Sequence, residues 1–471
     1  MDRQLISLLF AMGACGCKQL PPGPGDGGMA HYPGEVLSAV VRDNPDNVVS
    51  ALVDVTARHG DTVCIEYGDT TDYEHRSADY LVPDEGQLTV PVLGLRPAAQ
   101  SHIKLTAYHP DGSSVSSADI LFDTPPLPDD LPTFKASAGP HPMGGAILLG
   151  LLQFPHNFAL AAMVDHEGRL LWYRRAQPSA LGLDFQRQSN GHFTVFQSGP
   201  GAFEELDLAG NVLRQWTSPL AGGGINGHEM LILPGDHALL LGRELHTVDT
   251  RPYDNGGVAD ALAYKTTIDE VTPEGRVTFH WDSSLSMGLD EVDADVKLEG
   301  DGFDPIQPTA ISVLPDGNLL ASFRATSSLV KIDRHSGKVM WRLGGKKSDF
   351  QFIADAQNGF SHQLDARMLD NGDLLVFDGG SLHPAPASRV AQYRLDPVNH
   401  AATLVWEYRH VPALLSDGAG SARRLANGNT VVAWGTQGLV TEIDPFASVL
   451  WELSVANTVV FRAIPVPSVY P

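Results

Sequence analysis

Cysteine and positive charge are both scarce in this sequence. Its 471 residues include three cysteines, and 32 lysine and arginine residues stand against 56 aspartate and glutamate residues, for a formal net charge of −24. Three cysteines do not make a framework of several disulfide bonds. A protein that binds nucleic acid needs a basic surface to contact phosphates, so the acidic balance argues against DNA or RNA as a partner.

Several catalytic signatures are also missing. The chain contains no GxxxxGK[ST] phosphate loop, no GxSxG nucleophile elbow and no HExxH zinc motif. The sequence therefore offers no support for P-loop nucleotide chemistry, for a hydrolase with that elbow or for a zinc peptidase. After Ala14, no apolar run approaches the roughly 18 residues that span a bilayer.

The N-terminus has the pattern of an export signal. The apolar run from Leu5 to Ala14 is too short to cross a membrane and matches the hydrophobic part of a signal peptide. Met12-Gly13-Ala14-Cys15 is similar to a bacterial lipoprotein cleavage box, with Cys15 as the lipidated residue and Cys17 as the second candidate. We predict a signal peptide over 1–17 and a lipid-anchored protein in the periplasm or at the outer surface. A signal peptide without lipidation is the alternative.

The next segments predict a small domain between two proline-rich stretches. Residues 18–34 form a proline- and glycine-rich tether that cannot pack a core. Short alternating apolar runs without a helical period fill 35–124, which predicts an immunoglobulin-like or fibronectin-like β-sandwich. Residues 125–140 then form a proline-rich linker.

Residues 141–471 contain a repeat that predicts a β-propeller. Each unit has an apolar strand, a tight turn such as Asp316-Gly317, a second strand and a hairpin that ends in tryptophan. The six tryptophans are Trp172, Trp216, Trp281, Trp341, Trp406 and Trp451. Repeats of this length with four strands each are typical of propeller blades, whereas a solenoid would have shorter and more uniform units. The predicted fold is therefore all-β, with a six-bladed propeller after the sandwich.

Three blocks of this region resemble the bacterial arylsulfate sulfotransferase family. They are WRLGGKKSDF (341–350), HQLDARMLDNGDLLVFDGG (362–380) and GSARRLANGNT (420–430). Members of that family are built from a small β-sandwich and a six-bladed propeller. The resemblance implies transfer of a sulfuryl group from an aryl sulfate to a phenol through a sulfohistidine, without the nucleotide PAPS, a metal or another cofactor.

The resemblance also implies a catalytic histidine, but this sequence departs from the family motif. The family histidine lies in a QHDA motif, and here Leu364 stands at its place in Gln363-Leu364-Asp365-Ala366. His362 lies two residues earlier, and the strand period of two would turn both side chains to the same face. Gln307 likewise stands where a second family histidine is expected. We therefore predict His362 as the nucleophile.

Four further residues complete the predicted site. His228 and Arg324 are expected to hold the sulfuryl oxygens, and Arg389 and Asp365 to contact the substrate. An anionic donor also leads us to expect a locally positive central channel despite the net charge of −24. The acidic stretch from Glu291 to Asp304 lacks the spacing of a calcium loop and is interpreted as a solvated insertion.

The alternative function is a non-catalytic, lipid-anchored propeller. Such a protein would bind a small molecule or a protein partner through its central channel. The departures at Leu364 and Gln307 favour it, whereas the retained His228, His362 and Arg324 favour the enzyme. The sequence leaves the donor, the acceptor and the oligomeric state open.

Overall fold

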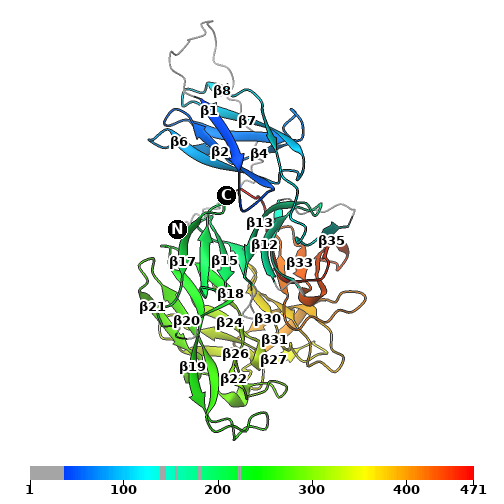
Figure 1. Cartoon of the computed structure of the whole chain (residues 1–471). Coiled ribbons are helices and arrows are strands. Elements are labelled where there is room, and N and C mark those ends of the chain that lie inside the picture. Colours follow the sequence, from blue (N-terminus) through cyan, green and yellow to red (C-terminus); the bar gives the residue numbers. More distant parts are fainter. Residues whose placement is uncertain are drawn as a thin grey trace, which may run out of the picture.

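The computed structural model describes residues 37–137, 145–153, 158–177, 183–220, 222 and 224–470. Over these residues the protein consists of β-strands and a few three-residue 3-10 turns (Figure 1), which confirms the predicted all-β class. The 3-10 turns are η1 (Ser283–Leu285), η2 (Leu289–Glu291), η3 (Arg324–Thr326) and η4 (Gly435–Gln437). Within the same residues, no helix is long and apolar enough to cross a membrane. The predicted signal peptide, the tether, Cys15 and Cys17 lie outside the described residues.

The first nine strands form two small sheets that share one apolar core. One sheet has the order β1-β2-β6, with β1 (Ser38–Asp43), β2 (Ser50–Thr56) and β6 (Gln87–Leu93). The other contains β3 (Thr62–Gly68), β4 (His75–Arg76), β5 (Tyr80–Leu81), β7 (Gln100–Tyr108), β8 (Ser114–Ser116) and β9 (Ile120–Asp123). Alternation such as Val53-Asp54-Val55 gives each sheet one buried apolar face, and Val53 packs in the same core as Ile65 and Leu105.

Six further sheets follow, each with four consecutively paired antiparallel strands. The first combines β11 (Ala146–Gln153), β12 (Phe158–Val164) and β13 (Leu170–Ala176) with β36 (Thr458–Val466). The second contains β14 (Phe185–Arg187), β15 (Phe193–Gln197), β16 (Ala202–Leu206) and β17 (Val212–Trp216). The third contains β18 (Ile225–Ile232), β19 (Ala238–Val248), β20 (Ala261–Val271) and β21 (Val277–Asp282).

The remaining three sheets have the same order. They are β23 (Pro308–Val313), β24 (Leu319–Phe323), β25 (Ser328–Ile332) and β26 (Val339–Gly344); β28 (Asp365–Met368), β29 (Leu374–Asp378), β30 (Arg389–Asp396) and β31 (Ala401–Tyr408); and β32 (Ser421–Arg424), β33 (Thr430–Ala433), β34 (Leu439–Ile443) and β35 (Val449–Val455). Three short strands extend the sheets: β10 (Phe134–Ala136) beside β35, β22 (Asp301–Phe303) beside β20 and β27 (Gln351–Ile353) beside β31.

Each predicted repeat corresponds to one of these sheets. The six tryptophans lie in the fourth strands β13, β17, β21, β26, β31 and β35. Trp281, for example, stacks on Phe323 of the next sheet with 5.8 Å between ring centroids, so the tryptophan joins neighbouring sheets. In the first hairpin of that next sheet, Gly317 has a φ of 82°, which side-chain-bearing residues rarely adopt.

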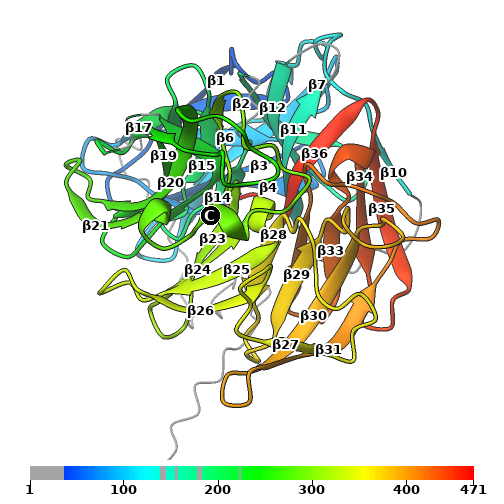
Figure 2. The ribbon, with the colours of Figure 1, turned by 90° about the horizontal axis from the view of Figure 1, so that it is seen from below.

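The six sheets surround a common centre, and we call them the ring (Figure 2). Neighbouring sheets contact one another in chain order, through pairs such as β18 with β23, β23 with β28 and β28 with β32. The last sheet contacts the first through β32 and β36, because β36 returns to pair with β11 from Ala146↔Val466 onward. The inner strands thereby bring polar residues from distant parts of the chain to one place.

The two small sheets dock on the ring near the end of the chain. The hydroxyl groups of Tyr67 and Tyr470 lie 2.9 Å apart in a hydrogen bond, and both side chains are buried. The Gly94 amide donates to the Leu171 carbonyl at 2.9 Å. This contact region includes a cavity.

Candidate active site

Six charged side chains fill the centre of the ring and form what we call the axial network. They are Asp184, Glu229, Asp365, Arg367, Arg423 and Arg462, and they come from five of the six sheets. Arg462 lies 3.0 Å from Asp184 and 3.2 Å from Glu229. Arg367 lies 2.5 Å from Glu229 and 2.9 Å from Asp365, which also pairs with Arg423. Three cations therefore balance three carboxylates.

Within the axial network, the pKa values of two carboxyl groups are shifted in opposite directions. Burial raises the pKa of Asp184 to about 7, against the opposing charge of Arg462. Burial alone would also raise the pKa of Asp365, but Arg367 and Arg423 outweigh it and lower that pKa to about 2. The network therefore holds the sheets together and has its charges satisfied internally.

The two predicted substrate contacts, Asp365 and Arg389, both lie in buried ion pairs. The Asp365 side chain is 1% exposed and accepts from Arg367 and Arg423, so its oxygens are occupied. Arg389 is also 1% exposed and pairs with Asp355 at 2.8 Å, with Asp378 at 2.9 Å and with Glu407 at 2.8 Å. Both side chains are buried in ion pairs, which a substrate would have to break to reach them.

His362 lies outside the axial network, three residues before the start of β28. Its side chain is 1% exposed, and its φ of 47° is in the left-handed region that non-glycine residues seldom adopt. The Ser381 hydroxyl lies 2.7 Å from Nδ1, and the His362 amide donates to the Ser327 hydroxyl at 3.0 Å. Nε2 is buried without a hydrogen-bond partner in the part of the chain that the structure describes. Strained backbone and an unsatisfied polar atom are both common at functional sites.

The expectation that His362 and Leu364 share one face is wrong. The strand β28 begins only at Asp365, so the period of two does not extend back to His362. Leu364 is 5% exposed and packs against apolar residues that include Phe377 and Trp434. The position of the family histidine is therefore a core position in this chain, while His362 faces polar groups.

Arg324 lies close to His362 and contacts Gln307. Its Nη1 donates to the Gln307 side chain at 2.9 Å, and its Nε donates to the Asp417 carbonyl at 2.7 Å. Burial, and next the charge of Arg324, lower the pKa of the His362 imidazole, although Asp295 and Asp417 act in the opposite direction. The imidazole is therefore neutral at pH 7.

Two aspartates that the sequence analysis missed border the free nitrogen of His362. Nε2 lies 3.6 Å from Asp293 Oδ2 and 3.5 Å from Asp295 Oδ1. Both belong to the acidic stretch interpreted as a solvated insertion, yet Asp293 is only 8% exposed and accepts from the Ser327 hydroxyl at 2.6 Å. With Asp417, three carboxylates lie near one guanidinium here, and Lys346 adds a further cation near Asp293.

A cavity of about 650 Å³ lies beside this cluster. Loop residues around Tyr253 and Asp295 form its wall together with Lys346. Pockets for small molecules have roughly 300–1,000 Å³, so an aryl sulfate would fit. Asp295 belongs to both the cavity wall and the surroundings of Nε2, whereas His362 itself does not line the cavity.

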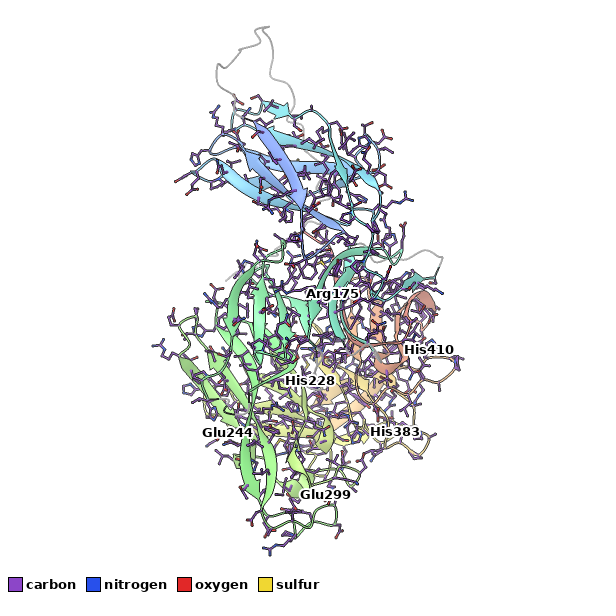
Figure 3. The ribbon with its side chains drawn as sticks, viewed as in Figure 1. Arg175, His228, Glu244, Glu299, His383 and His410 are labelled. Atoms are coloured by element: carbon purple, nitrogen blue, oxygen red, sulfur yellow. The ribbon has the colours of Figure 1, made fainter. Side chains whose placement is uncertain are left out.

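His228 lies inside the ring in different surroundings (Figure 3). Its Nδ1 is 2.6 Å from the Asn226 side-chain oxygen, and its ring packs edge-on against Phe461 at 5.2 Å between centroids. The side chain is half-buried. Of the predicted residues, the structure thus brings His362 and Arg324 together, while His228 contacts β36.

Comparison with solved structures gives only distant matches. A protein of unknown function from Bacteroides caccae is 16% identical, with a TM-score of 0.42, and the match covers 69% of this chain and 99% of that one. A streptogramin B lyase is 11% identical, with a TM-score of 0.36 and coverage of 68% and 86%. A catalytically inactive virginiamycin B lyase from Staphylococcus aureus is 10% identical, with a TM-score of 0.34 and coverage of 86% and 99%.

Comparison of the sequence with protein families is more informative. No curated protein matches the chain. The model of the arylsulfotransferase (ASST) family matches residues 151–463, which is more than half of the sequence and includes all three blocks identified above. The chain therefore belongs to the arylsulfotransferase family.

Proposed function

We propose that this protein transfers a sulfuryl group from an aryl sulfate to a phenol, with His362 as the nucleophile and without PAPS. The observation that carries the proposal is the unpartnered Nε2 of His362, on a buried imidazole whose pKa is lowered. A neutral imidazole is the form that can attack sulfur. When Nδ1 donates its proton to the Ser381 hydroxyl, the lone pair is on Nε2 and faces the cluster of Asp293 and Asp295.

The proposed reaction has two displacements at sulfur. In the first, the Nε2 lone pair forms an N–S bond as the S–O bond to the aryl oxygen breaks, and the departing phenolate takes a proton from water and leaves as the phenol. In the second, the acceptor phenol loses its proton, its oxygen bonds to sulfur, and the N–S bond breaks. His362 is thereby regenerated as the neutral imidazole. Each step moves one sulfuryl group and needs no outside oxidant or reductant.

The neighbours of His362 suit the charge changes in this cycle. Arg324, which contributes to the lowered pKa of His362, is a donor for the sulfuryl oxygens. Burial raises the pKa of Asp293, which favours its protonated form beside an anionic group. Asp295, with a side chain 49% exposed at the cavity, is a base for the acceptor phenol. We leave His228, Asp365 and Arg389 out of the chemical steps.

We also propose that the ring is a six-bladed β-propeller. Its support is the correspondence of six tryptophan repeats with six sheets and the pairing of β36 with β11. The two small sheets are then an immunoglobulin-like or fibronectin-like sandwich over 35–124, with the linker over 125–140 and the propeller over 141–471. Export and lipid anchoring at Cys15 remain a proposal from the N-terminal sequence.

Intact mass spectrometry during turnover tests the proposed function. Purified protein would be mixed with an aryl sulfate, and released phenol would be recorded together with the protein mass. We expect an adduct of one sulfuryl group that is absent in His362→Gln, which keeps a polar side chain but cannot attack sulfur. His335→Ala, which removes an exposed histidine, is the matched control and should retain the adduct. An adduct that persists in His362→Gln would remove His362 from the mechanism.

The second candidate is a ring that binds a ligand without chemistry. The excess of carboxylates near His362 favours it, because Asp293, Asp295 and Asp417 disfavour an anionic donor. The absence of both an adduct and released phenol over a panel of aryl sulfates would support this second function. In that case, saturable binding of phenols without turnover would identify the cavity beside Asp295 as a binding site.

A further inference from the structure

We propose a second small-molecule site where the two small sheets meet the ring, with an aromatic anion as its ligand. The site is a cavity of about 830 Å³, within the roughly 300–1,000 Å³ typical of ligand pockets. Its wall comes from the small sheets, from the proline-rich segment around Leu127 and Leu131, and from the turn at Gly168 to Leu170. Cavities at the junction of two packed bodies are a common location for ligand sites.

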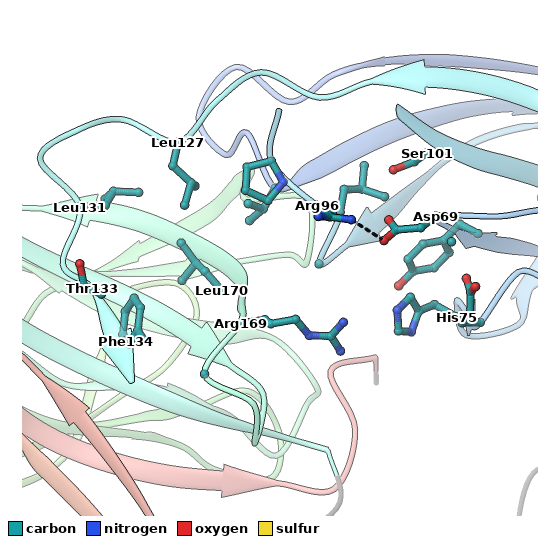
Figure 4. Close-up of a pocket in the computed structure, with 18 of the residues that line it drawn as sticks. Asp69, His75, Arg96, Ser101, Leu127, Leu131, Thr133, Phe134, Arg169 and Leu170 are labelled. Atoms are coloured by element: carbon teal, nitrogen blue, oxygen red, sulfur yellow. Dashed lines mark hydrogen bonds and ion pairs between the residues drawn. The ribbon is translucent and has the colours of Figure 1, made fainter. Parts of the chain in front are cut away.

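One side of the cavity is apolar (Figure 4). Leu127, Leu131, Phe134 and Leu170 lie together there, and Figure 4 shows them opposite Asp69 and His75. All four apolar side chains are partly exposed although they border the same core cluster. A flat apolar ring placed against them would remove this surface from water, which is favourable by roughly 25 cal/mol per Å².

Two guanidinium groups lie between the apolar and the polar side. Arg96 is 71% exposed, and its single ion pair, with Asp69, is long at 3.4 Å. Arg169 is 56% exposed and contacts Asp165 at 2.7 Å and Glu167 at 3.2 Å, in both cases through Nε. Among the described residues, no hydrogen bond involves the terminal nitrogens of Arg169, which leaves them available to a ligand.

The arrangement selects an anion that carries an aromatic body. A guanidinium group binds carboxylate and sulfonate oxygens with two parallel hydrogen bonds, which favours a planar or tetrahedral anion over a neutral hydroxyl. Asp69 and Glu74 also line the cavity, and they restrict the negative group to the space beside Arg96 and Arg169. No residue of the His362 cluster lines this cavity, so the inference does not rest on the proposed function.

Isothermal titration of the full chain with 2-naphthalenesulfonate tests this site. The probe has a carbon–sulfur bond, so it cannot act as a sulfuryl donor. We expect saturable binding, similar binding of 2-naphthoate, and at least about tenfold weaker binding of neutral 2-naphthol, because the charged hydrogen bonds are lost. Equal binding of 2-naphthol would contradict the role of the guanidinium groups, and no binding up to the solubility limit of the probe would overturn the site.

Three variants locate the bound probe. Arg96→Ala and Arg169→Ala should each weaken 2-naphthalenesulfonate binding by about tenfold or more. Arg251→Ala is the matched control, because Arg251 is 63% exposed, pairs with a neighbouring aspartate and does not line the cavity. Each variant is checked by its thermal unfolding midpoint. Unchanged affinity in both cavity variants would place the probe elsewhere and overturn the proposal.

Discussion

Asp184 and Arg462 are 278 residues apart in the chain and form an ion pair of 3.0 Å at the centre of the ring. Both side chains are at most 1% exposed. Asp184 directly precedes the second sheet of the ring, and Arg462 lies on β36 in the first. The pair therefore connects the C-terminal strand β36 to an inner strand that lies much earlier in the sequence.

We expect Arg462→Ala to lower the free energy of unfolding by about 3–5 kcal/mol, because it leaves Asp184 and Glu229 buried without this cation. Urea denaturation at pH 7 measures the change. Arg42→Ala removes an exposed ion pair with Asp54 and should cost no more than about 1 kcal/mol. Equal effects of the two substitutions would show that the axial network contributes no more than a surface pair.

Asp184→Asn should change how stability depends on pH. The folded pKa of Asp184, about 7, lies above the ordinary aspartate value of 3.8 because the side chain is buried. The stability from this group is therefore present below about pH 3.8 and is lost as pH rises through about 7, with a slope of up to about 1.4 kcal/mol per pH unit. Denaturation between pH 4 and pH 7 should show this loss in the parent protein and a smaller loss in the variant. The exposed Asp370→Asn should leave the slope unchanged.

Arg324→Gln should raise the pKa of His362, because a positive charge that disfavours the imidazolium is removed. The lowered pKa of the parent keeps the imidazole neutral to a more acidic pH than usual. The acidic limb of the rate profile should therefore move to higher pH in the variant. NMR titration with labelled histidine gives the same comparison without turnover. An unmoved His362 titration, or an equal shift in Arg251→Gln, would contradict this electrostatic coupling.

Leu364→His should not create an active site. Leu364 packs in the apolar cluster with Phe377 and Trp434, so an imidazole there would be buried without a partner at a cost of about 1–3 kcal/mol. Leu364→Met keeps the volume and should cost less than about 1.5 kcal/mol. Thermal unfolding and aryl-sulfate turnover compare the two variants. Higher turnover in Leu364→His would mean that a side chain at position 364, where the family has its histidine, can still reach the substrate.

The positions of the strands were predictable because their signals are local. Alternation such as Val53-Asp54-Val55 and turns such as Asp316-Gly317 act between neighbouring residues, and each tryptophan repeat accordingly corresponds to one sheet. The candidate site was only partly predictable. His362 and Arg324 do lie near one another, but the left-handed backbone at His362 removed the alternation from which its orientation was inferred.

By itself, the sequence determined the all-β class, the repeat of six units and the membership in the arylsulfotransferase family. Tertiary structure alone decided which polar residues are available to contact a substrate. Asp365 and Arg389 resemble substrate contacts in the sequence, yet partners distant along the chain bury them in ion pairs. Asp293 and Asp295 resemble a solvated insertion, yet the fold brings them to the free nitrogen of His362. The physical reason is that strand and turn preferences act over a few residues, whereas burial and ion pairing depend on segments that meet only after the ring has formed.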